Sequence, residues 1–283
     1  MSRGIWVKVN YDGGIGLSGI VVSLDSRLNI YKEADVEFQF IDTASLRKYA
    51  SRGNVKAQNV LGDRYFNGDT VDIDYNEAVK WYKKAAFAGY DIAMYNLGDM
   101  YYCGLGVEMD FSKTIEWYKK SALKGNVNAQ CNLGCMYENG EGVECDYSEA
   151  LGWYKKAADQ GDYLAQYNLA GMYMHSKGVE EDCSEAFKWY EKSAKQGYEK
   201  AQNTIGYMYE KGLGIRRDYK EAVKWYREAA ECGYAYAEYN LAEMYYKGKG
   251  VMRNLSSAYS WYKRCASHGL ESGKIALREK FNK

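Results

Sequence analysis

Three cysteines and one histidine are the residues whose types could most directly do chemistry. Cys131 and Cys135 are four residues apart, which places them on one face of a helix, and Cys103 and His175 stand at equivalent points of the neighbouring sequence repeats. Thiolate and imidazole groups bind zinc, and a Cys–His pair can form an activated nucleophile. The chain nevertheless has no C-x2-C pair, no segment typical of an oxyanion hole and only two histidines. We therefore expect no catalytic residue, no metal and no cofactor. The protein is predicted not to be an enzyme, and a thiol- or metal-dependent enzyme is the least favoured alternative.

The overall composition argues against several classes of partner. The 283 residues include 38 basic and 38 acidic side chains, so no net charge favours nucleic acid or an anionic membrane. The hydrophobic fraction of 47% is typical of a soluble globular protein. No apolar run approaches the roughly 18 residues of a membrane-spanning helix. Seven irregularly spaced cysteines and no recognisable signal peptide predict reduced thiols and a cytoplasmic location. The 30 tyrosines, about three times ordinary usage, need an explanation of their own.

That explanation is an internal repeat of 36 residues. Six tryptophans recur at this spacing, and a tyrosine follows each of them: Trp81, Trp117, Trp153, Trp189, Trp225 and Trp261. We number positions within each repeat from a recurring alanine, so that repeats 1 to 6 start at Ala57, Ala93, Ala129, Ala165, Ala201 and Ala237. Position 9 is then always tyrosine and position 33 is always glycine. Such register over six repeats excludes chance.

Each repeat predicts two helices, which we call helix A and helix B. Positions 1 to 11 carry apolar or small residues on one helical face, and a glycine-rich turn follows. Helix B is expected to begin at position 18, where a short polar side chain can cap it: Asp74, Asp110, Asp146, Asp182, Asp218 and Asn254. A glutamate three residues later predicts a capping box in four repeats: Glu77, Glu149, Glu185 and Glu221. The glycine at position 33 is expected to end helix B in the left-handed conformation.

The pattern A-x3-L-G-x2-Y-x2-G-x-G-V-x2-D-x2-E-A-x2-W-Y-x-K-A-A-x2-G resembles the Sel-1-like repeat family, which is related to tetratricopeptide repeats. The resemblance covers residues 44–283 and implies an all-α fold, a right-handed α/α superhelical solenoid of six helix-turn-helix repeats. Residues 44–53 are expected to form the second helix of a degenerate leading repeat, and residues 273–283 a C-terminal capping helix. Thr70 and Ser176 replace loop glycines, so those two loops are expected to differ in shape. Thr114 replaces a helix-B alanine.

The first 43 residues do not fit the repeat. Ile5 to Tyr11 and Val36 to Phe40 alternate apolar and polar residues, and a turn-like Asp12-Gly13-Gly14 stands between them. This pattern predicts a small β-rich N-terminal segment of two or three strands.

By analogy with tetratricopeptide geometry, the resemblance implies that helix-A positions 3, 7, 10 and 11 face a concave groove, with position 4 close by. We call these the groove positions. The candidate partner-binding residues there are Asp63, Phe66, Tyr95, Asn96, Asp99, Tyr102, Asn132, Glu138, Tyr167, Asn168, Tyr207, Glu210, Tyr239, Asn240, Glu243 and Tyr246. Position 11 contributes the basic residues Lys211 and Lys247. Tyrosines are good interface anchors, and the acids favour a basic protein or peptide partner. A merely solvated groove is the alternative. The asparagines could clamp an extended peptide or bond within the scaffold.

Two other periodic features have structural explanations. Positions 27 and 28 are mostly lysine or arginine, as in Lys83 and Lys84, but they fall in the last turns of helix B, where cations complement the helix dipole. Methionines at position 8, such as Met100 and Met136, are expected in the core. The sequence therefore gives no reason to expect nucleic-acid binding.

These observations predict a non-enzymatic protein–protein interaction solenoid, and the family resemblance implies a bacterial origin. One specific version, suggested by the resemblance, is an immunity protein that neutralises a toxin. A general scaffold or adaptor in a regulatory or virulence complex is the principal alternative.

Overall fold

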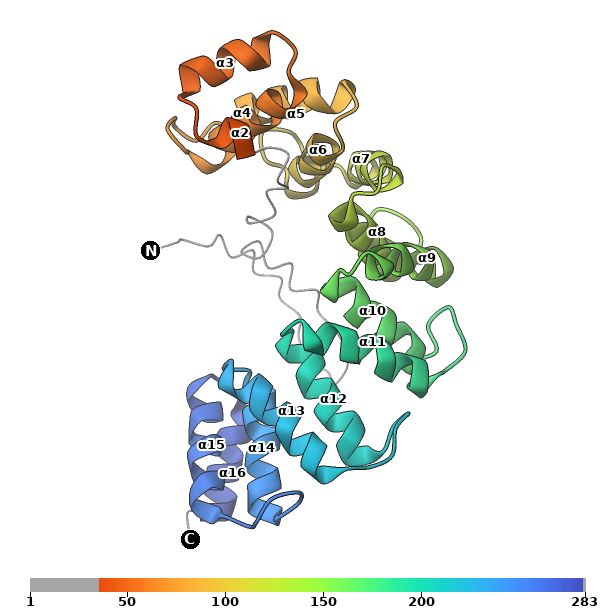
Figure 1. The fold of residues 1–283 in the computed structure, drawn as a ribbon, viewed down its shortest axis with the longest axis vertical. Helices are drawn as coiled ribbons and strands as arrows, with labels where there is room; N and C mark the ends of the chain where they lie inside the picture. Colours follow the sequence, from red (N-terminus) through yellow and green to blue (C-terminus); the bar gives the residue numbers. More distant parts are fainter. Residues whose placement is uncertain (1–35, 282–283) are drawn as a thin grey trace. The chain divides into compact units, whose positions relative to one another are not determined.

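The computed structural model describes residues 36–281, and every regular element among them is an α-helix (Figure 1). The helices are α2 (Val36–Gln39), α3 (Thr43–Ser51), α4 (Val55–Asn67), α5 (Tyr75–Phe87), α6 (Asp91–Cys103), α7 (Phe111–Leu123), α8 (Val127–Asn139), α9 (Tyr147–Asp159), α10 (Tyr163–Met174), α11 (Cys183–Lys195), α12 (Glu199–Lys211), α13 (Tyr219–Glu231), α14 (Ala235–Lys247), α15 (Leu255–Ser267) and α16 (Glu271–Phe281). Helices α4 to α15 are the A and B helices of the six repeats in turn. Helix α3 is the expected leading helix B, and α16 corresponds to the expected capping helix.

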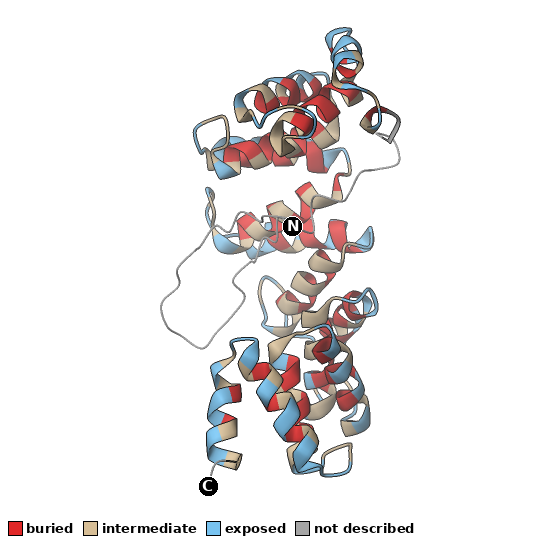
Figure 2. Cartoon of the chain, turned by 90° about the vertical axis from the view of Figure 1, so that its left-hand side faces the viewer, coloured by how far each residue is buried: buried red, intermediate tan, exposed pale blue. Residues whose placement is uncertain are grey.

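The chain divides into two compact bodies, with the boundary after Ala129 in α8. The N-terminal body holds repeats 1 and 2, and the C-terminal body holds nearly all of repeat 3 and repeats 4 to 6. Within each body, helices that follow one another along the chain pack together, as α4 does on α5 and α14 on α15. Figure 2 shows buried and exposed residues alternating along these helices, as expected where one face of each helix is packed.

The predicted β-rich segment is wrong where the structure describes it, and its strands before residue 36 lie outside the described residues. The alternating stretch from Val36 to Phe40 is not a strand but contains the short helix α2. Phe38 is buried against α3, with its ring 5.6 Å from that of Tyr49, whereas Phe40 is fully exposed. Arg64 of α4 donates to the carbonyls of Gln39 and Ile41. A five-residue alternation is too short to specify a strand. The aromatic contact of Phe38 and the hydrogen bonds from Arg64 fix the backbone of this segment instead.

The predicted N-caps are confirmed, but the capping boxes are only half formed. The Asp74 carboxylate accepts from the backbone of Asn76 and Glu77, and the position-18 side chains of the other repeats cap helix B in the same way. The backbone N–H of Asp74, however, donates to the carbonyl of Tyr65 at 2.9 Å, as its counterparts do in every repeat. Glu77 therefore does not reach back to the cap and instead pairs with Lys80.

The two residues that replace loop glycines keep a positive φ, but the loop at Ser176 begins differently, because α10 ends at Met174, one residue earlier than helix A of the other repeats. Thr70 and Ser176 adopt φ values of 65° and 55°, close to the 66° of Gly106. The Thr70 hydroxyl bonds that of Thr43 at 2.7 Å, which helps to hold the unfavourable backbone conformation. Thr114 is fully buried, and its hydroxyl is satisfied by the Asp110 carbonyl of the previous helical turn.

The position-26 tyrosines are the central packing element of each repeat. All six are buried between helices A and B: Tyr82, Tyr118, Tyr154, Tyr190, Tyr226 and Tyr262. Four repeats have glycine at position 6, directly beneath the ring, and a Cβ atom at Gly98 would lie only 2.5 Å from Tyr118. The glycine therefore lets helix A approach the aromatic ring closely. The position-8 methionines are buried beside them, as predicted.

Helix A of one repeat is also tied to helix B of the preceding repeat through position 2. Gln58, Gln166 and Gln202 each donate from the side-chain amide to a carbonyl of the preceding helix B. Repeat 6 has Glu238 instead, which is fully buried, forms an ion pair with Arg264 at 2.6 Å and lies 2.9 Å from Nδ1 of His268. The substitution replaces a neutral amide contact with a buried charge that needs both partners.

Gly250→Ala is expected to destabilise the C-terminal body by about 3 kcal/mol. Gly250 has a φ of 68°, and an added Cβ would overlap the backbone carbonyl of Tyr219. Gly152→Ala is the matched control, because Gly152 lies inside α9 with nothing within 4 Å of an added Cβ. It should raise stability by about 0.5 to 1 kcal/mol. Urea unfolding measures both, and equal effects would contradict the loop packing described above.

Candidate functional site

The acids at the groove positions bind tyrosines of their own repeats. The hydroxyl of Tyr82 donates to Asp63 at 2.7 Å, that of Tyr154 to Glu138 at 2.8 Å and that of Tyr226 to Glu210 at 3.1 Å. Tyr118 donates to Asp99 and Tyr262 to Glu243 in the same manner. Each repeat that has an acid at position 7 or position 10 therefore uses it as the acceptor for its buried position-26 tyrosine.

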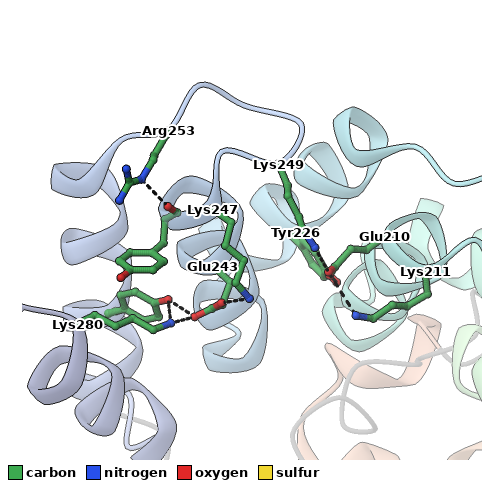
Figure 3. A network of polar contacts seen from close by, with 10 residues as sticks. Glu210, Lys211, Tyr226, Glu243, Lys247, Lys249, Arg253 and Lys280 are labelled. Carbon is green, nitrogen blue, oxygen red and sulfur yellow. Dashed lines mark hydrogen bonds and ion pairs between the residues drawn. The ribbon is translucent and has the colours of Figure 1, made fainter.

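In the C-terminal body, lysines of the chain also pair with these carboxylates (Figure 3). Glu210 lies between Lys211 and Lys249, at 3.4 and 3.7 Å, and Glu243 contacts Lys247 and Lys280. Lys249 comes from position 13 of the following repeat, so the contact joins successive repeats.

Repeat 3 has the same arrangement. Lys177, again at position 13 of the following repeat, reaches Glu138 at 2.8 Å. The Glu138 and Lys177 side chains are only 16% and 23% exposed, so this pair is held more tightly than a surface ion pair. The charges of Glu138, Glu210 and Glu243 are therefore largely compensated within the chain.

The groove asparagines bond to the neighbouring helix A where their partners are described. Asn96 donates to Asn59 at 3.0 Å and also to Asp63, and Asn240 donates to Asn203 at 2.9 Å. Asn168 donates weakly to the sulfur of Cys135 at 3.7 Å. The amide nitrogen of each of these three asparagines already bonds to the preceding repeat. These contacts are the bonding within the scaffold that was the alternative to clamping a peptide.

The groove tyrosines at position 3 pack against the position-26 tyrosines. Tyr95 is buried and stacks on Tyr118 with ring centroids 5.6 Å apart. Tyr167 and Tyr239 are half-buried and make edge contacts with Tyr190 and Tyr262.

The aromatic residues at position 10 are also held by neighbouring rings. Phe66 packs on Tyr75, Tyr102 on Phe111 and Tyr246 on Phe281, and all three remain half-buried. Tyr207, at position 7, is the most exposed of the candidate partner-binding residues, with 45% of its surface accessible.

One group of aromatic residues was missed at the sequence level. Tyr198 and Tyr234 occupy the N-caps of α12 and α14, where neither side chain caps the helix. The ring of Tyr198 lies 5.2 Å from those of both Tyr163 and Tyr167, and that of Tyr234 lies 5.5 Å from the exposed Tyr236. The sequence signal for this group is a tyrosine at the N-cap of helix A. Other repeats have Asn54 or Asp162 there, and the side chain accepts a backbone hydrogen bond. Losing such a cap costs about 1 kcal/mol.

The cysteines and histidine do not form a chemical site in the part of the chain that the structure describes. Cys135 accepts from the Tyr154 hydroxyl at 3.2 Å, and His175 is exposed at the end of α10. Burial raises the pKa of the Cys265 thiol to about 11, which disfavours the reactive thiolate. Among residues 36–281, no three His, Cys, Asp or Glu side chains come together as a metal site.

The basic residues of helix B have a structural partner beyond the helix dipole. Lys84, Lys120, Lys156 and Lys192, all at position 28, place the ammonium 3.5 to 4.2 Å from the ring centre of the position-25 tryptophan. Arg264 does the same at 5.3 Å. These cations cover the tryptophan faces, and this accounts for their recurrence without an external partner.

Comparison with protein families identifies the class of protein. Six successive segments match the Sel1 repeat: residues 55–90, 91–126, 127–162, 164–198, 199–234 and 235–270. The chain therefore belongs to the Sel1 repeat family, and the family resemblance of the sequence is confirmed. No curated protein matches the chain as a whole.

Solved structures show the same fold. The crystal structure of c5321, described as a protective antigen present in uropathogenic Escherichia coli strains, is 36% identical over 86% of this chain, with a TM-score of 0.82. The chain corresponds to only 53% of that protein's length. A Sel1 repeat protein from Oxalobacter formigenes is 29% identical over 82% of this chain and 95% of its own, with a TM-score of 0.69. Among the described helices, none is long and apolar enough to cross a membrane.

Lys177→Ala is expected to lower the stability of the C-terminal body by about 1 to 2 kcal/mol, because it leaves a mostly buried carboxylate without its cation. Lys195→Ala is the control, since its pair with Glu191 is exposed and should contribute less than about 0.5 kcal/mol. Adding Glu138→Gln to Lys177→Ala should recover most of the loss, because an amide oxygen can still accept from Tyr154. Urea unfolding curves measure all three, and no recovery in the double variant would contradict the charge argument.

Proposed function

We propose that this chain is a non-enzymatic interaction protein that binds a protein partner through the helix-A face of its repeats. Sel1 repeat proteins mediate protein–protein interactions. The observation that carries the proposal is the set of accessible aromatic side chains at the groove positions, which each of the two bodies has. Tyr102, Tyr167, Tyr239 and Tyr246 are each held by another ring, so they lose little conformational entropy on binding.

The partner's charge is a separate part of the proposal. A basic partner was expected from the groove acids, but Glu138, Glu210 and Glu243 are paired with lysines of the chain. The aromatic contacts therefore support the proposal more strongly than the charge does. A partner attracted mainly by net charge would bind more weakly as salt increases, whereas an aromatic interface would respond little.

The narrower role of an immunity protein that neutralises a toxin stays a prediction of the family resemblance. An immunity protein from Pseudomonas aeruginosa shares the fold at 21% identity and a TM-score of 0.44, a likeness too distant to argue function. A general scaffold or adaptor role fits the same surface. The identity of the captured partner distinguishes the two roles.

Tyr207→Ala is expected to weaken partner binding at least tenfold, because Tyr207 is the most accessible groove tyrosine. Tyr259→Ala is the matched control: its exposure of 43% is close to the 45% of Tyr207, but it lies on helix B. The partner is captured with the tagged full chain from cells of the source organism and identified by mass spectrometry. Calorimetry with the purified partner then compares the variants at two salt concentrations.

Loss of binding in Tyr207→Ala with retention in Tyr259→Ala supports the helix-A face. Equal affinities in both variants would place the interface elsewhere on the chain and overturn the proposal.

A further inference from the structure

Repeat 4 departs from the pairing of acid and tyrosine. Its position 7 is Gly171 and its position 10 is Met174, so neither carries a carboxylate. Tyr190 nevertheless occupies the same place as the other position-26 tyrosines. It is 4% exposed and makes an edge contact with Tyr167 at 5.2 Å.

The Tyr190 hydroxyl has no hydrogen-bond partner among residues 36–281, whereas the hydroxyls of the other five position-26 tyrosines donate to carboxylates. The Tyr190 ring is buried like those of the other repeats, but its hydroxyl lacks the carboxylate acceptor that they have. The absence of an acceptor at this one repeat is therefore a feature that needs an explanation.

Among residues 36–281, no side chain takes the place of the missing carboxylate next to Gly171. A Cβ atom built on Gly171 would meet only the Tyr190 hydroxyl oxygen, 3.5 Å away, and nothing else within 4 Å. At the same position in repeat 6, Glu243 fills this space and accepts from Tyr262. We call the space between Gly171 and the Tyr190 hydroxyl the repeat-4 notch.

The acid–tyrosine pairs of the other repeats favour a carboxylate as the group that occupies the notch. Tyr190 is close enough to Glu138 that its pKa is raised by burial first, then by Tyr167 and by Glu138, so the hydroxyl stays protonated and can donate. Glu138 is already paired with Lys177, so an incoming lysine would find that carboxylate occupied. An incoming carboxylate would accept from the hydroxyl, as the carboxylates of the other five repeats do.

We propose that an aspartate or glutamate side chain of the protein partner occupies the repeat-4 notch and accepts a hydrogen bond from Tyr190. This rests on the proposed function, since it identifies which group of the partner the helix-A face anchors. The partner completes, in trans, the contact that the other five repeats make within the chain. At this repeat the partner is acidic, in contrast to the basic surface expected from the groove acids.

Three variants test the notch itself by urea unfolding of the full chain. Tyr190→Phe removes a hydroxyl without a partner, so the unfolding midpoint should stay the same or rise. Tyr226→Phe is the matched control and should lower the midpoint, because its hydroxyl donates to Glu210. Gly171→Glu reproduces the Ala242-Glu243 sequence of repeat 6 and should raise the midpoint, but not when Tyr190→Phe is also present. Tyr190→Phe destabilising as much as Tyr226→Phe would show that the hydroxyl already has an acceptor, and would overturn the proposal.

Calorimetry with the partner identified by capture tests its carboxylate. Tyr190→Phe should weaken binding about tenfold, and Gly171→Glu more, because it fills the notch with the chain's own acid. Replacing the partner's aspartates and glutamates one at a time with asparagine or glutamine should identify one residue whose loss is not additive with Tyr190→Phe. If Tyr207→Ala weakens binding but Tyr190→Phe and Gly171→Glu do not, the notch proposal fails while the proposed function stands. If none of the three weakens binding, the proposed function fails as well.

Discussion

The phenol hydroxyl of the position-26 tyrosine is the polar group on which the architecture of each repeat depends. Its ring is buried between helices A and B, where desolvation makes an unpaired hydroxyl unfavourable. A carboxylate on helix A provides the acceptor, and it can come from position 7, as in Asp63, or one turn later, as in Glu138. The carboxylate is then itself partly buried, and in repeats 3 and 5 a lysine from the following repeat compensates its charge. Intrarepeat packing and contacts between repeats therefore have the same origin.

This dependence changes the meaning of the groove acids. Counted along the sequence, they give a surface that favours a basic partner. In the structure they are acceptors for tyrosines, and three of them are also paired with lysines, so they mainly stabilise the repeats. The side chains left to contact a partner are the aromatic ones. Tyr207 occupies position 7, but the Tyr226 hydroxyl of its repeat does not need it as an acceptor, because Glu210 accepts from position 10. When an acid at position 7 or position 10 accepts from the tyrosine, the side chain at the other position is available to contact a partner.

Much of the fold could be predicted because its determinants are local and recur every 36 residues. Helix starts followed from single capping residues such as Asp74, and helix ends from glycines with positive φ such as Gly89. Side-chain contacts between successive repeats could not be predicted from local sequence. Glu138 and Lys177, for example, are 39 residues apart and meet only when adjacent repeats stack. The capping box failed for a related reason, since the cap N–H finds a carbonyl of helix A before it can find a side chain. Thr70 kept its loop shape through a hydroxyl contact with Thr43, which precedes the first complete repeat.

In a repeat protein, where stability is a sum of local terms, a departure from the pattern is tolerated when the chain compensates it nearby. Thr114 satisfies its hydroxyl on its own helix, and Glu238 gains Arg264 and His268 in place of an amide contact. Gly171 differs from these, because it removes an acceptor and leaves the Tyr190 hydroxyl without a replacement among the described residues. A repeat that gives up a stabilising contact at a groove position has a group available for an external acceptor. The exceptions to the repeat, rather than its regular positions, are therefore where specificity for a partner is most readily encoded.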